Sequence, residues 1–182
     1  MKARTIRTMD GGGRGERLLR FDTAWGPAWL TYRPAPFTIW RIRLPGTKPE
    51  PLPDTQDDAA HPSAALLVAQ TLTDFFSGCR PMTVPEDWLA LDRLTPKERA
   101  ILRAARNIPY GTTRTYAQVA SMAGFPRGAR FAGNALHKNP FPVAVPCHRV
   151  VRSDGSLGGF AGGCKIKKKM IALEAASLGK EC

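Results

Sequence analysis

The second half of the sequence carries the start and stop signals of three short helices, and these signals restrict the possible fold more than any other feature. Thr95 with Glu98 and Thr115 with Gln118 each match a capping box, in which two side chains satisfy backbone N–H groups at a helix start. Gly124 is a typical residue just beyond a helix end. We therefore predict helices over residues 96–106, 116–122 and 126–138.

The last two of these helices are joined by a glycine turn, which is the pattern of a helix-turn-helix. The second of them places Arg127, Arg130, Asn134 and Lys138 on the side away from its apolar residues. Such a face suits contacts with phosphates and with a nucleic-acid groove. The alternative is an ordinary pair of antiparallel helices, which is a common arrangement.

The charge of the chain is unevenly distributed. Residues 1–92 hold 11 Lys and Arg against 11 Asp and Glu, whereas residues 93–182 hold 16 against 4, so the whole formal charge of +12 lies in the second half. A basic half beside a neutral half indicates a polyanion partner for the second half. Because charge alone is weak evidence, a merely basic surface remains the alternative.

The first half of the sequence predicts a small domain of its own. Residues 18–44 are rich in Trp, Tyr, Phe, Thr and Ile and predict two or three strands, with turns at Gly26-Pro27 and at residues 34–36. Residues 64–76 have a helical pattern. We therefore predict an α+β chain with a flexible arm over residues 1–16, a small strand-rich α/β domain and linker over 17–92, and a mostly helical domain over 93–182.

A cysteine and a histidine stand next to each other in the apolar run of residues 143–151, which reads V-A-V-P-C-H-R-V-V. One interpretation is a core strand with an inert thiol, because free cysteine is among the most buried residue types. The other is a nucleophile with its base. Neighbouring residues of a strand point to opposite faces, so Cys147 and His148 can cooperate only if the chain turns there or a water molecule joins them. Pro146 favours such a break in the strand.

A carboxylate on the last predicted helix completes a candidate constellation. Residues 165–179 predict a helix with Ile166, Met170 and Leu173 on one face and Glu174 at the edge of that face. A buried carboxylate needs a partner, because burying it alone is costly. A thiol reacts only after it has lost its proton, a histidine can take that proton, and a carboxylate can orient the histidine.

Other kinds of site find little support in the sequence. The glycine-rich residues 152–165 lack the G-x-G-x-x-G spacing of a dinucleotide site. The four cysteines are widely spaced and form no C-x-x-C pair, so we expect neither a metal site nor a disulfide. No apolar run reaches the length of a transmembrane helix, and residues 1–19 lack an apolar signal core, so we expect a cytoplasmic protein without a membrane segment.

Four segments between Asn107 and Glu174 resemble the O6-alkylguanine-DNA alkyltransferases, the methylated-DNA–protein-cysteine methyltransferase family. They read IPYGTTRTYAQVA, ARFAGNALHKNP, VPCHRVV and GSLGGFAGG with its following helix. The resemblance implies a ribonuclease H-like domain over residues 17–92 and a DNA-binding alkyltransferase domain with a winged-helix-like helix-turn-helix over 93–182. The first half of the chain matches the family only in outline.

The resemblance implies DNA repair by an irreversible and stoichiometric reaction. The alkyl group of O6-alkylguanine, and also that of O4-methylthymine, would pass from a flipped nucleotide in double-stranded DNA to Cys147. The product thioether is stable, so one turnover would consume the protein. The family needs no metal or organic cofactor, and the resemblance implies a monomer.

The resemblance also implies a role for each matching residue. His148, through a water molecule, and Glu174 would activate Cys147, while Tyr116 would donate a proton to the departing guanine. Arg130 would fill the gap that the flipped base leaves. The other implied residues are the DNA contacts Thr115, Arg127, Ala129, Gly133 and Asn134, and the pocket residues Tyr116, Asn139, Val150, Phe160 and Ala161.

Two residues of this chain differ from those of some family members. Phe160 and Ala161 stand where some relatives have tyrosine and serine, so side-chain hydroxyl contacts are lost and the range of alkyl groups stays open.

Three other functions are alternatives to repair. Relatives that bind alkylated DNA without repairing it lack the cysteine, and Cys147 argues against that function. A helix-turn-helix regulator lacks support because no dimerisation segment is evident. A cysteine hydrolase is disfavoured because adjacent Cys and His cannot exchange a proton directly on a strand.

Overall fold

The computed structural model of the chain describes residues 15–47, 61–79 and 83–178. It divides into two compact units, of which the first is Met1–Ser77 with Pro81–Ala90 and the second is Gly78–Arg80 with Leu91–Cys182. Most of the predicted flexible arm, residues 1–14, lies outside the described residues.

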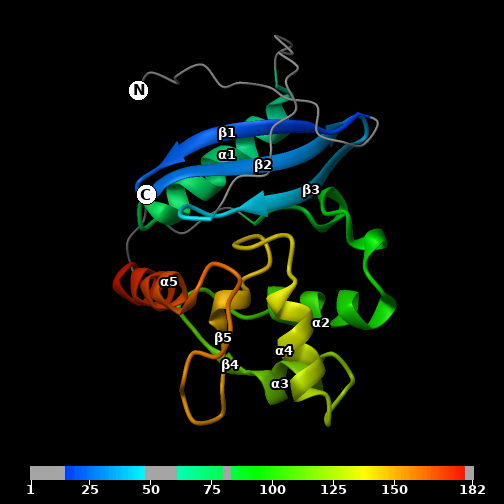
Figure 1. Cartoon of the computed structure of the whole chain (residues 1–182), viewed down its shortest axis with the longest axis vertical. Helices are drawn as coiled ribbons and strands as arrows, with labels where there is room; N and C mark the ends of the chain where they lie inside the picture. Colours follow the sequence, from blue (N-terminus) through cyan, green and yellow to red (C-terminus); the bar gives the residue numbers. More distant parts are fainter. Residues whose placement is uncertain (1–14, 48–60, 80–82, 179–182) are drawn as a thin grey trace. The chain divides into compact units, whose positions relative to one another are not determined.

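Three antiparallel strands and one long helix make up most of the first unit (Figure 1). β1 (Arg17–Thr23), β2 (Gly26–Pro34) and β3 (Phe37–Arg43) lie in that order in one sheet. α1 (Ser63–Phe76) packs against β1 and β2, and its Phe75 is fully buried. A short 3-10 turn, η1 (Glu86–Trp88), follows. The prediction of a small strand-rich domain is confirmed.

The turn between the first two strands lies earlier than predicted. Gly26 and Pro27 belong to β2, and residues 24 and 25 make the turn instead. The Thr23 hydroxyl closes this turn, because it donates to the carbonyl oxygen of Gly26 at 2.7 Å and accepts from the Trp25 N–H at 3.2 Å.

The second unit is mostly helical, as predicted. A 3-10 turn, η2 (Leu91–Arg93), precedes α2 (Pro96–Arg106), and α3 (Tyr116–Met122) follows. Both predicted capping boxes are present at the starts of α2 and α3, with the side chain and backbone bonds in both directions. α3 packs against α2 and against the next helix.

That next helix, α4 (Ala129–His137), starts later than the predicted residue 126. Pro126 and Arg127 lie in a turn that the Gly128 N–H closes by donating to the carbonyl oxygen of Phe125 at 2.7 Å. Gly128 then becomes the residue that precedes the helix, and Ala129 opens it. The helix-turn-helix pairing of α3 with α4 is therefore present, with a longer turn than the sequence suggests.

The apolar run of residues 143–151 is mostly not a strand. Only β5 (Val150–Val151) is extended, and it pairs in parallel with β4 (Arg114–Thr115). Before it, η3 (Cys147–Arg149) forms a 3-10 turn. Pro146 has no N–H to give to a sheet, and the Cys147 N–H donates to the carbonyl oxygen of Val145 at 2.8 Å, so the backbone turns instead of extending.

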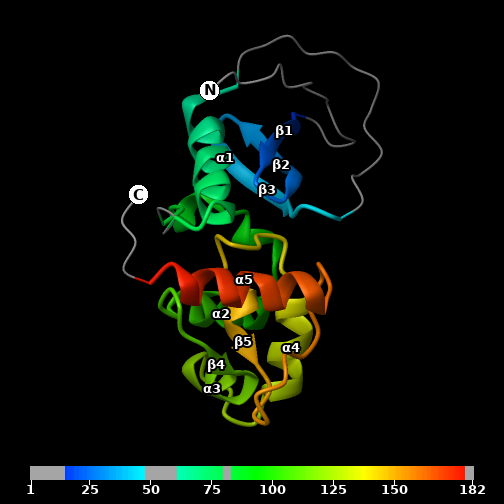
Figure 2. The same cartoon turned by 90° about the vertical axis from the view of Figure 1, so that its left-hand side faces the viewer.

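The last helix, α5 (Cys164–Ala176; Figure 2), packs against η3. The predicted apolar face is partly wrong, because the fully buried residues of α5 are Lys167, Met170 and Glu174, whereas Ile166 and Leu173 are only half-buried. Two charged side chains on the inner face of one helix need partners inside the unit. Their partners form the site described below.

The cysteines of the chain differ in burial and bonding. Cys147 is buried and free, Cys164 is exposed and free, and Cys79 is disulfide-bonded, so the expectation of no disulfide is wrong. Cys182 lies outside the described residues.

Among the described helices, none has both the length and the hydropathy that crossing a membrane requires. In the same residues, no group of three or more His, Cys, Asp or Glu side chains is placed to hold a metal ion.

Candidate active site and nucleic-acid interface

Asn139 holds the thiol of Cys147 in place at the start of η3. The side-chain amide of Asn139 donates to Cys147 Sγ at 3.1 Å and to the carbonyl oxygen of Val145 at 3.0 Å. Its Oδ1 accepts from the Phe141 N–H at 3.0 Å. Cys147 itself is only 5% exposed. One buried amide therefore fixes both the loop before the cysteine and the direction of the sulfur atom.

His148 and Glu174 form the pair that the sequence suggested. Nε2 of His148 lies 2.7 Å from Oε1 of Glu174, and both residues are almost completely buried. An ionised carboxylate can only accept, so His148 donates through Nε2 and Nδ1 is the acceptor nitrogen of the ring. Because Cys147 and His148 lie on a 3-10 turn, the opposite-face geometry of a strand does not apply to them.

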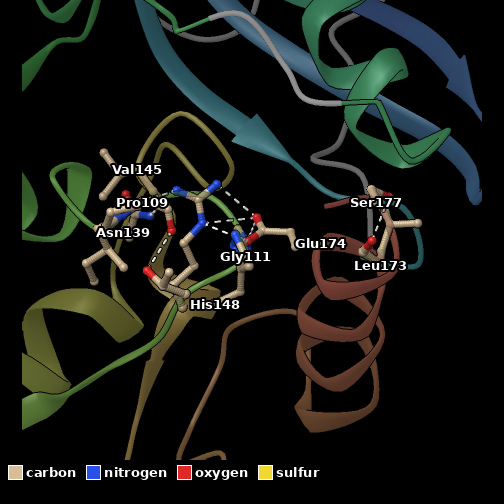
Figure 3. A network of polar contacts seen from close by, with 11 residues as sticks. Pro109, Gly111, Asn139, Val145, His148, Leu173, Glu174 and Ser177 are labelled. Atoms are coloured by element: carbon tan, nitrogen blue, oxygen red, sulfur yellow. Dashed lines mark hydrogen bonds and ion pairs between the residues drawn. The ribbon is translucent and has the colours of Figure 1, made fainter. Parts of the chain in front are cut away.

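The Glu174 carboxylate has two further partners, which the sequence reasoning did not assign (Figure 3). The Gly111 N–H donates to its Oε2 at 2.9 Å. Arg149 donates from Nε to Oε2 at 2.9 Å and from Nη2 to Oε1 at 2.9 Å, and its Nη1 reaches the carbonyl oxygen of Ile108 at 2.7 Å. Glu174 thus joins the loop after α2, the turn η3 and the helix α5 at one point.

The environment shifts the pKa of each member of this group. Burial by itself raises the pKa of Glu174, but the hydrogen bonds from His148 and Arg149 outweigh it, so the net pKa is lowered. Burial lowers the pKa of His148, against the attraction of Glu174. Burial raises the pKa of Cys147, against the hydrogen bond from Asn139 and the charge of Lys167. At neutral pH the group therefore consists of an ionised glutamate, a neutral histidine and a protonated thiol.

Tyr116 opens α3 and points its phenol at the glycine-rich loop after β5. Its hydroxyl donates to the carbonyl oxygen of Gly159 at 3.3 Å. Gly158 has a φ of +65°, and a Cβ atom there would lie 2.7 Å from the Tyr116 hydroxyl oxygen. Burial raises the pKa of Tyr116. The loop can therefore approach the phenol only because residue 158 has no side chain.

Lys167 is a member of the site that the sequence reasoning missed. Its Nζ donates to the carbonyl oxygen of Val150 at 2.5 Å and to the Tyr116 hydroxyl at 3.3 Å, and the side chain is fully buried. The spacing of Lys167, Met170 and Glu174 is that of one helix face, but the run K-I-K-K-K resembles a solvated basic stretch. Arg149 is a second member of the site that the sequence does not reveal, because its pairing with Glu174 depends on a contact between distant segments.

A groove with a volume of about 640 Å³ runs between the helix-turn-helix and the loop after β5. The predicted DNA contacts Thr115, Ala129, Arg130, Gly133 and Asn134 all line it, together with Tyr116. Arg152 and Asp154 are on the opposite wall. Arg127 does not line the groove and is exposed in the turn before α4. The groove is therefore open to a polyanion along the helix that carries Arg130.

The predicted pocket residues are not all brought to this groove. Asn139, Val150 and Phe160 are buried, and they do not line it. Ala161 is exposed, beside Phe160 on the same loop. The Val150 carbonyl oxygen accepts from Lys167, and Asn139 contacts the thiol directly. The thiol, the phenol and the helix-turn-helix therefore belong to one unit, in which the phenol lines the groove and the buried thiol does not.

The second unit matches a known family over residues 96–176, which is described as the DNA-binding domain of 6-O-methylguanine DNA methyltransferase. The chain is 40% identical over 124 residues to the methylated-DNA–protein-cysteine methyltransferase of Methanothermobacter thermautotrophicus, covering 67% of this chain and 68% of the relative. It is 33% identical over 132 residues to the enzyme of the same name from Methanosarcina barkeri, covering 58% of this chain and 84% of the relative. The chain belongs to the O6-methylguanine DNA methyltransferase family.

Solved structures of this family show the same arrangement of elements. A crystal structure of Mycobacterium tuberculosis OGT in complex with DNA is similar with a TM-score of 0.69 and 31% identity, over 87% of this chain and 92% of that one. The O6-methylguanine-DNA methyltransferase of Pyrococcus kodakaraensis has the same fold at 20% identity, with a TM-score of 0.55. The α+β class with a helical second unit is confirmed by these similarities and by the family match.

Proposed function

We propose that this protein repairs O6-methylguanine in DNA by transferring the methyl group irreversibly to the sulfur of Cys147. The observation that carries the proposal is the placement of a buried thiol, held by Asn139, next to a histidine that is paired with Glu174. This group lies in the unit that matches the DNA-binding domain of a methyltransferase family. The basic second half of the chain supplies the charge that a DNA partner requires.

The lesion has to leave the duplex before it can react. The O6 atom of a paired guanine is enclosed in the base stack, so the nucleotide must rotate out into the protein. Arg130 is exposed on α4 and lines the groove, where it can enter the stack and take the place of the rotated base. Gly133 is one turn further along the same helix and lets the DNA backbone approach closely.

The transfer itself is a displacement at the methyl carbon. The Cys147 thiol gives its proton to Nδ1 of His148 through a water molecule, and the thiolate forms a sulfur–carbon bond while the bond between the carbon and O6 breaks. The electron pair of that bond stays with guanine, which takes a proton from the Tyr116 hydroxyl. Glu174 holds His148 in the tautomer that leaves Nδ1 free to accept a proton.

The bound base would be read by groups of the loop around the thiol. The Cys147 and Val150 carbonyl oxygens and the Ala161 N–H are the proposed contacts. The Val150 carbonyl oxygen already accepts from Lys167 and retains one lone pair for the base. Phe160 offers an apolar surface without a hydroxyl group, so it adds no hydrogen bond to the base.

The product explains why the reaction stops after one turnover. A thioether on Cys147 has no second nucleophile to remove it, so each chain accepts one alkyl group. In this proposal the substrate is double-stranded DNA that contains the lesion, and O4-methylthymine is a second lesion that the protein repairs. The protein acts as a monomer in the cytoplasm and needs no metal or cofactor. These points follow from the family resemblance and remain predictions.

The proposal is tested by the loss of O6-methylguanine from a duplex oligonucleotide. Wild-type protein is expected to remove the methyl group from duplex DNA and also to react with free O6-benzylguanine. Arg130→Ala is expected to react about tenfold or more slowly with the duplex and at the wild-type rate with the free base, because only the duplex needs base rotation. Lys97→Ala, which removes an exposed charge at the start of α2, outside the helix-turn-helix, is the matched control. A wild-type protein inert toward the duplex contradicts the function, and equal slowing of both reactions by Arg130→Ala contradicts the role of Arg130.

Gly158→Ala is expected to slow methyl transfer by about tenfold or more, because its Cβ atom would lie 2.7 Å from the Tyr116 hydroxyl oxygen and would displace the proton donor. Gly155→Ala is the control: its φ of +81° is equally unfavourable for alanine, but no atom lies within 4 Å of the added carbon. Single-turnover transfer rates of the two variants separate the steric effect from backbone strain. Equal rates in the two variants would remove Tyr116 from the proton-donor role.

A further inference from the structure

The backbone of Val143 has a conformation that a β-branched residue rarely adopts. Its φ is 71°, and among the described residues no other residue apart from glycine has a positive φ. In this left-handed region the branched side chain crowds the backbone, so the conformation persists only where the surroundings hold it. Val143 lies four residues before Cys147, in the loop that leads to the proposed nucleophile. The contacts of this loop must therefore supply the force that maintains the strain.

Asn139 fixes the two ends of the turn in which Val143 is the middle residue. The Val145 N–H donates to the carbonyl oxygen of Phe141 at 2.7 Å, which closes a turn of five residues. Asn139 accepts from the Phe141 N–H and donates to the Val145 carbonyl oxygen (Figure 3), each at 3.0 Å. Phe141 and Val145 are both almost completely buried. The ends of the turn are thus held by hydrogen bonds and by burial.

Arg106, near the end of α2, holds the same turn from outside the loop. Its Nη1 donates to the carbonyl oxygen of Ala144 at 3.2 Å, although 38 positions separate the two residues in the sequence. A hydrogen bond from a charged donor is stronger than one between neutral groups. Ala144 directly follows the strained residue, so the bond from Arg106 opposes a relaxation of the backbone at Val143.

The turn is connected to the thiol through one carbonyl oxygen. The Val145 carbonyl oxygen accepts from Asn139 Nδ2 at 3.0 Å and from the Cys147 N–H at 2.8 Å. The same Asn139 amide donates to Cys147 Sγ at 3.1 Å. A shift of Val145 would therefore move both the amide and the sulfur. Because a displacement needs the sulfur in line with the alkyl carbon, such a shift would slow the reaction.

We propose that Arg106 positions the Cys147 thiol for alkyl transfer by holding the strained turn at Val143 closed. This inference rests on the proposed function. Arg106 acts through the backbone of Ala144 and Val145, so it is a positioning residue and not a catalytic one.

The pKa of Cys147 reports on the same arrangement. Burial raises this pKa, and the hydrogen bond from Asn139 is the largest of the effects that oppose burial, ahead of the charge of Lys167. The other titratable groups beside the thiol are Tyr116 on α3, which interacts with it electrostatically, and His148, its neighbour in η3. If the turn opens, the bond from Asn139 weakens and the pKa of Cys147 rises further, while these other groups stay in place.

The test measures the alkylation of Cys147 by iodoacetamide from about pH 6 to about pH 10, with the modified peptide quantified by mass spectrometry. Arg106→Met and Arg106→Ala remove the donor to Ala144, whereas Arg106→Lys keeps a cationic donor. Lys97→Met is the matched control, because it removes an exposed charge from the same helix. Circular dichroism establishes that each variant is folded before it is measured.

The midpoint of the Cys147 profile is expected to rise by about half a pH unit or more in Arg106→Met and Arg106→Ala, which is about a threefold lower rate below the midpoint. Arg106→Lys should lie between these variants and the wild type, and Lys97→Met should match the wild type. A midpoint in the folded Met or Ala variant equal to that of Lys97→Met overturns the proposal. Iodoacetamide does not need DNA, so a failure of the repair activity itself would leave this result readable.

Alkyl transfer from free O6-benzylguanine measures the position of the sulfur more directly. Arg106→Met is expected to slow this reaction by about tenfold or more, and by more than it slows alkylation at the same pH, because a bound guanine cannot follow a displaced sulfur as the small reagent can. Duplex binding in a mobility-shift assay should stay at the wild-type level, since Arg106 does not line the groove. Equal slowing of the two reactions overturns the positioning role of Arg106.

Val143→Gly separates the strain from the hydrogen bond itself. Glycine adopts a positive φ without strain, so the turn then depends less on a clamp from α2. The slowing of alkyl transfer by Arg106→Met should therefore be at least about threefold smaller in the Val143→Gly background than in the wild type. Equal slowing in both backgrounds overturns the part of the proposal that concerns the strain at Val143.

Discussion

Cys147→Ser is expected to abolish methyl transfer while DNA binding is retained. Serine keeps the shape of the side chain, and its hydroxyl oxygen can still accept from the Asn139 amide that now lies 3.1 Å from the sulfur. An alcohol ionises far less readily than a thiol, so the nucleophile is lost, and transfer should fall by at least about a thousandfold. The measurements are transfer of a labelled methyl group from duplex DNA and binding of the same duplex in a mobility-shift assay.

Cys164→Ser is the matched control for this experiment. Cys164 is an exposed free thiol at the start of α5, in the same unit. The control is expected to transfer at the wild-type rate. If transfer survives in Cys147→Ser and is lost in Cys164→Ser, the nucleophile is Cys164, and the assignment of Cys147 is contradicted.

Glu174→Ala is expected to lower the free energy of unfolding by about 3 to 5 kcal/mol. The substitution leaves Arg149, which is 9% exposed, without the carboxylate that accepts three of its hydrogen bonds, and it removes the partner of His148. Urea unfolding followed by tryptophan fluorescence measures the loss. The double variant with Arg149→Met should recover part of it, because the buried cation is then gone as well.

The pH dependence of this loss is fixed by the direction of the Glu174 shift. The folded-state pKa of Glu174 lies below its usual value, so the carboxylate contributes its full stability above the unfolded-state pKa. That contribution disappears as the pH falls through the folded-state value. The difference between wild type and Glu174→Ala should therefore shrink in acid, and a loss below about 1 kcal/mol at neutral pH would contradict the structural role of Glu174.

The helical part of the fold could be predicted because its signals are local. A capping box sets the start of a helix within four residues, and both boxes lie where the sequence places them. The start of α4 could not be placed in the same way, since the turn at Phe125 and Gly128 is closed by a backbone bond that no side chain announces. The first turn of the sheet was misplaced for a different reason: the Thr23 side chain closes it at residues 24 and 25, and Gly26-Pro27 is the stronger turn signal in the sequence.

The site could be predicted where chemistry alone selects the residues. A thiol, an imidazole and a carboxylate form a recognisable set, and the structure brings His148 to 2.7 Å from Glu174. Arg149 and Lys167 were missed because a buried cation resembles a solvated one in sequence. Only the three-dimensional contacts, with Glu174 in one case and with Tyr116 and Val150 in the other, distinguish them.

The geometry of the cysteine is the clearest case of a tertiary effect. An apolar run with four valines predicts a strand, and a strand would separate Cys147 from His148. Pro146 removes one backbone donor, and the bond from the Cys147 N–H to Val145 replaces the ladder of a sheet with a turn. The residue types therefore indicate the chemistry of Cys147 and His148, whereas the 3-10 turn that carries them cannot be read from the sequence.

The central claim is tested most directly by the mass of the protein after incubation with a duplex oligonucleotide that contains one O6-methylguanine. Intact-protein mass spectrometry and peptide mapping should find a gain of about 14 mass units, the replacement of a thiol hydrogen by a methyl group. The gain should lie on the peptide that contains Cys147 and should not exceed one methyl group per chain with excess substrate. Tight binding of the duplex without a change in mass, or a methyl group on another residue, would contradict the account.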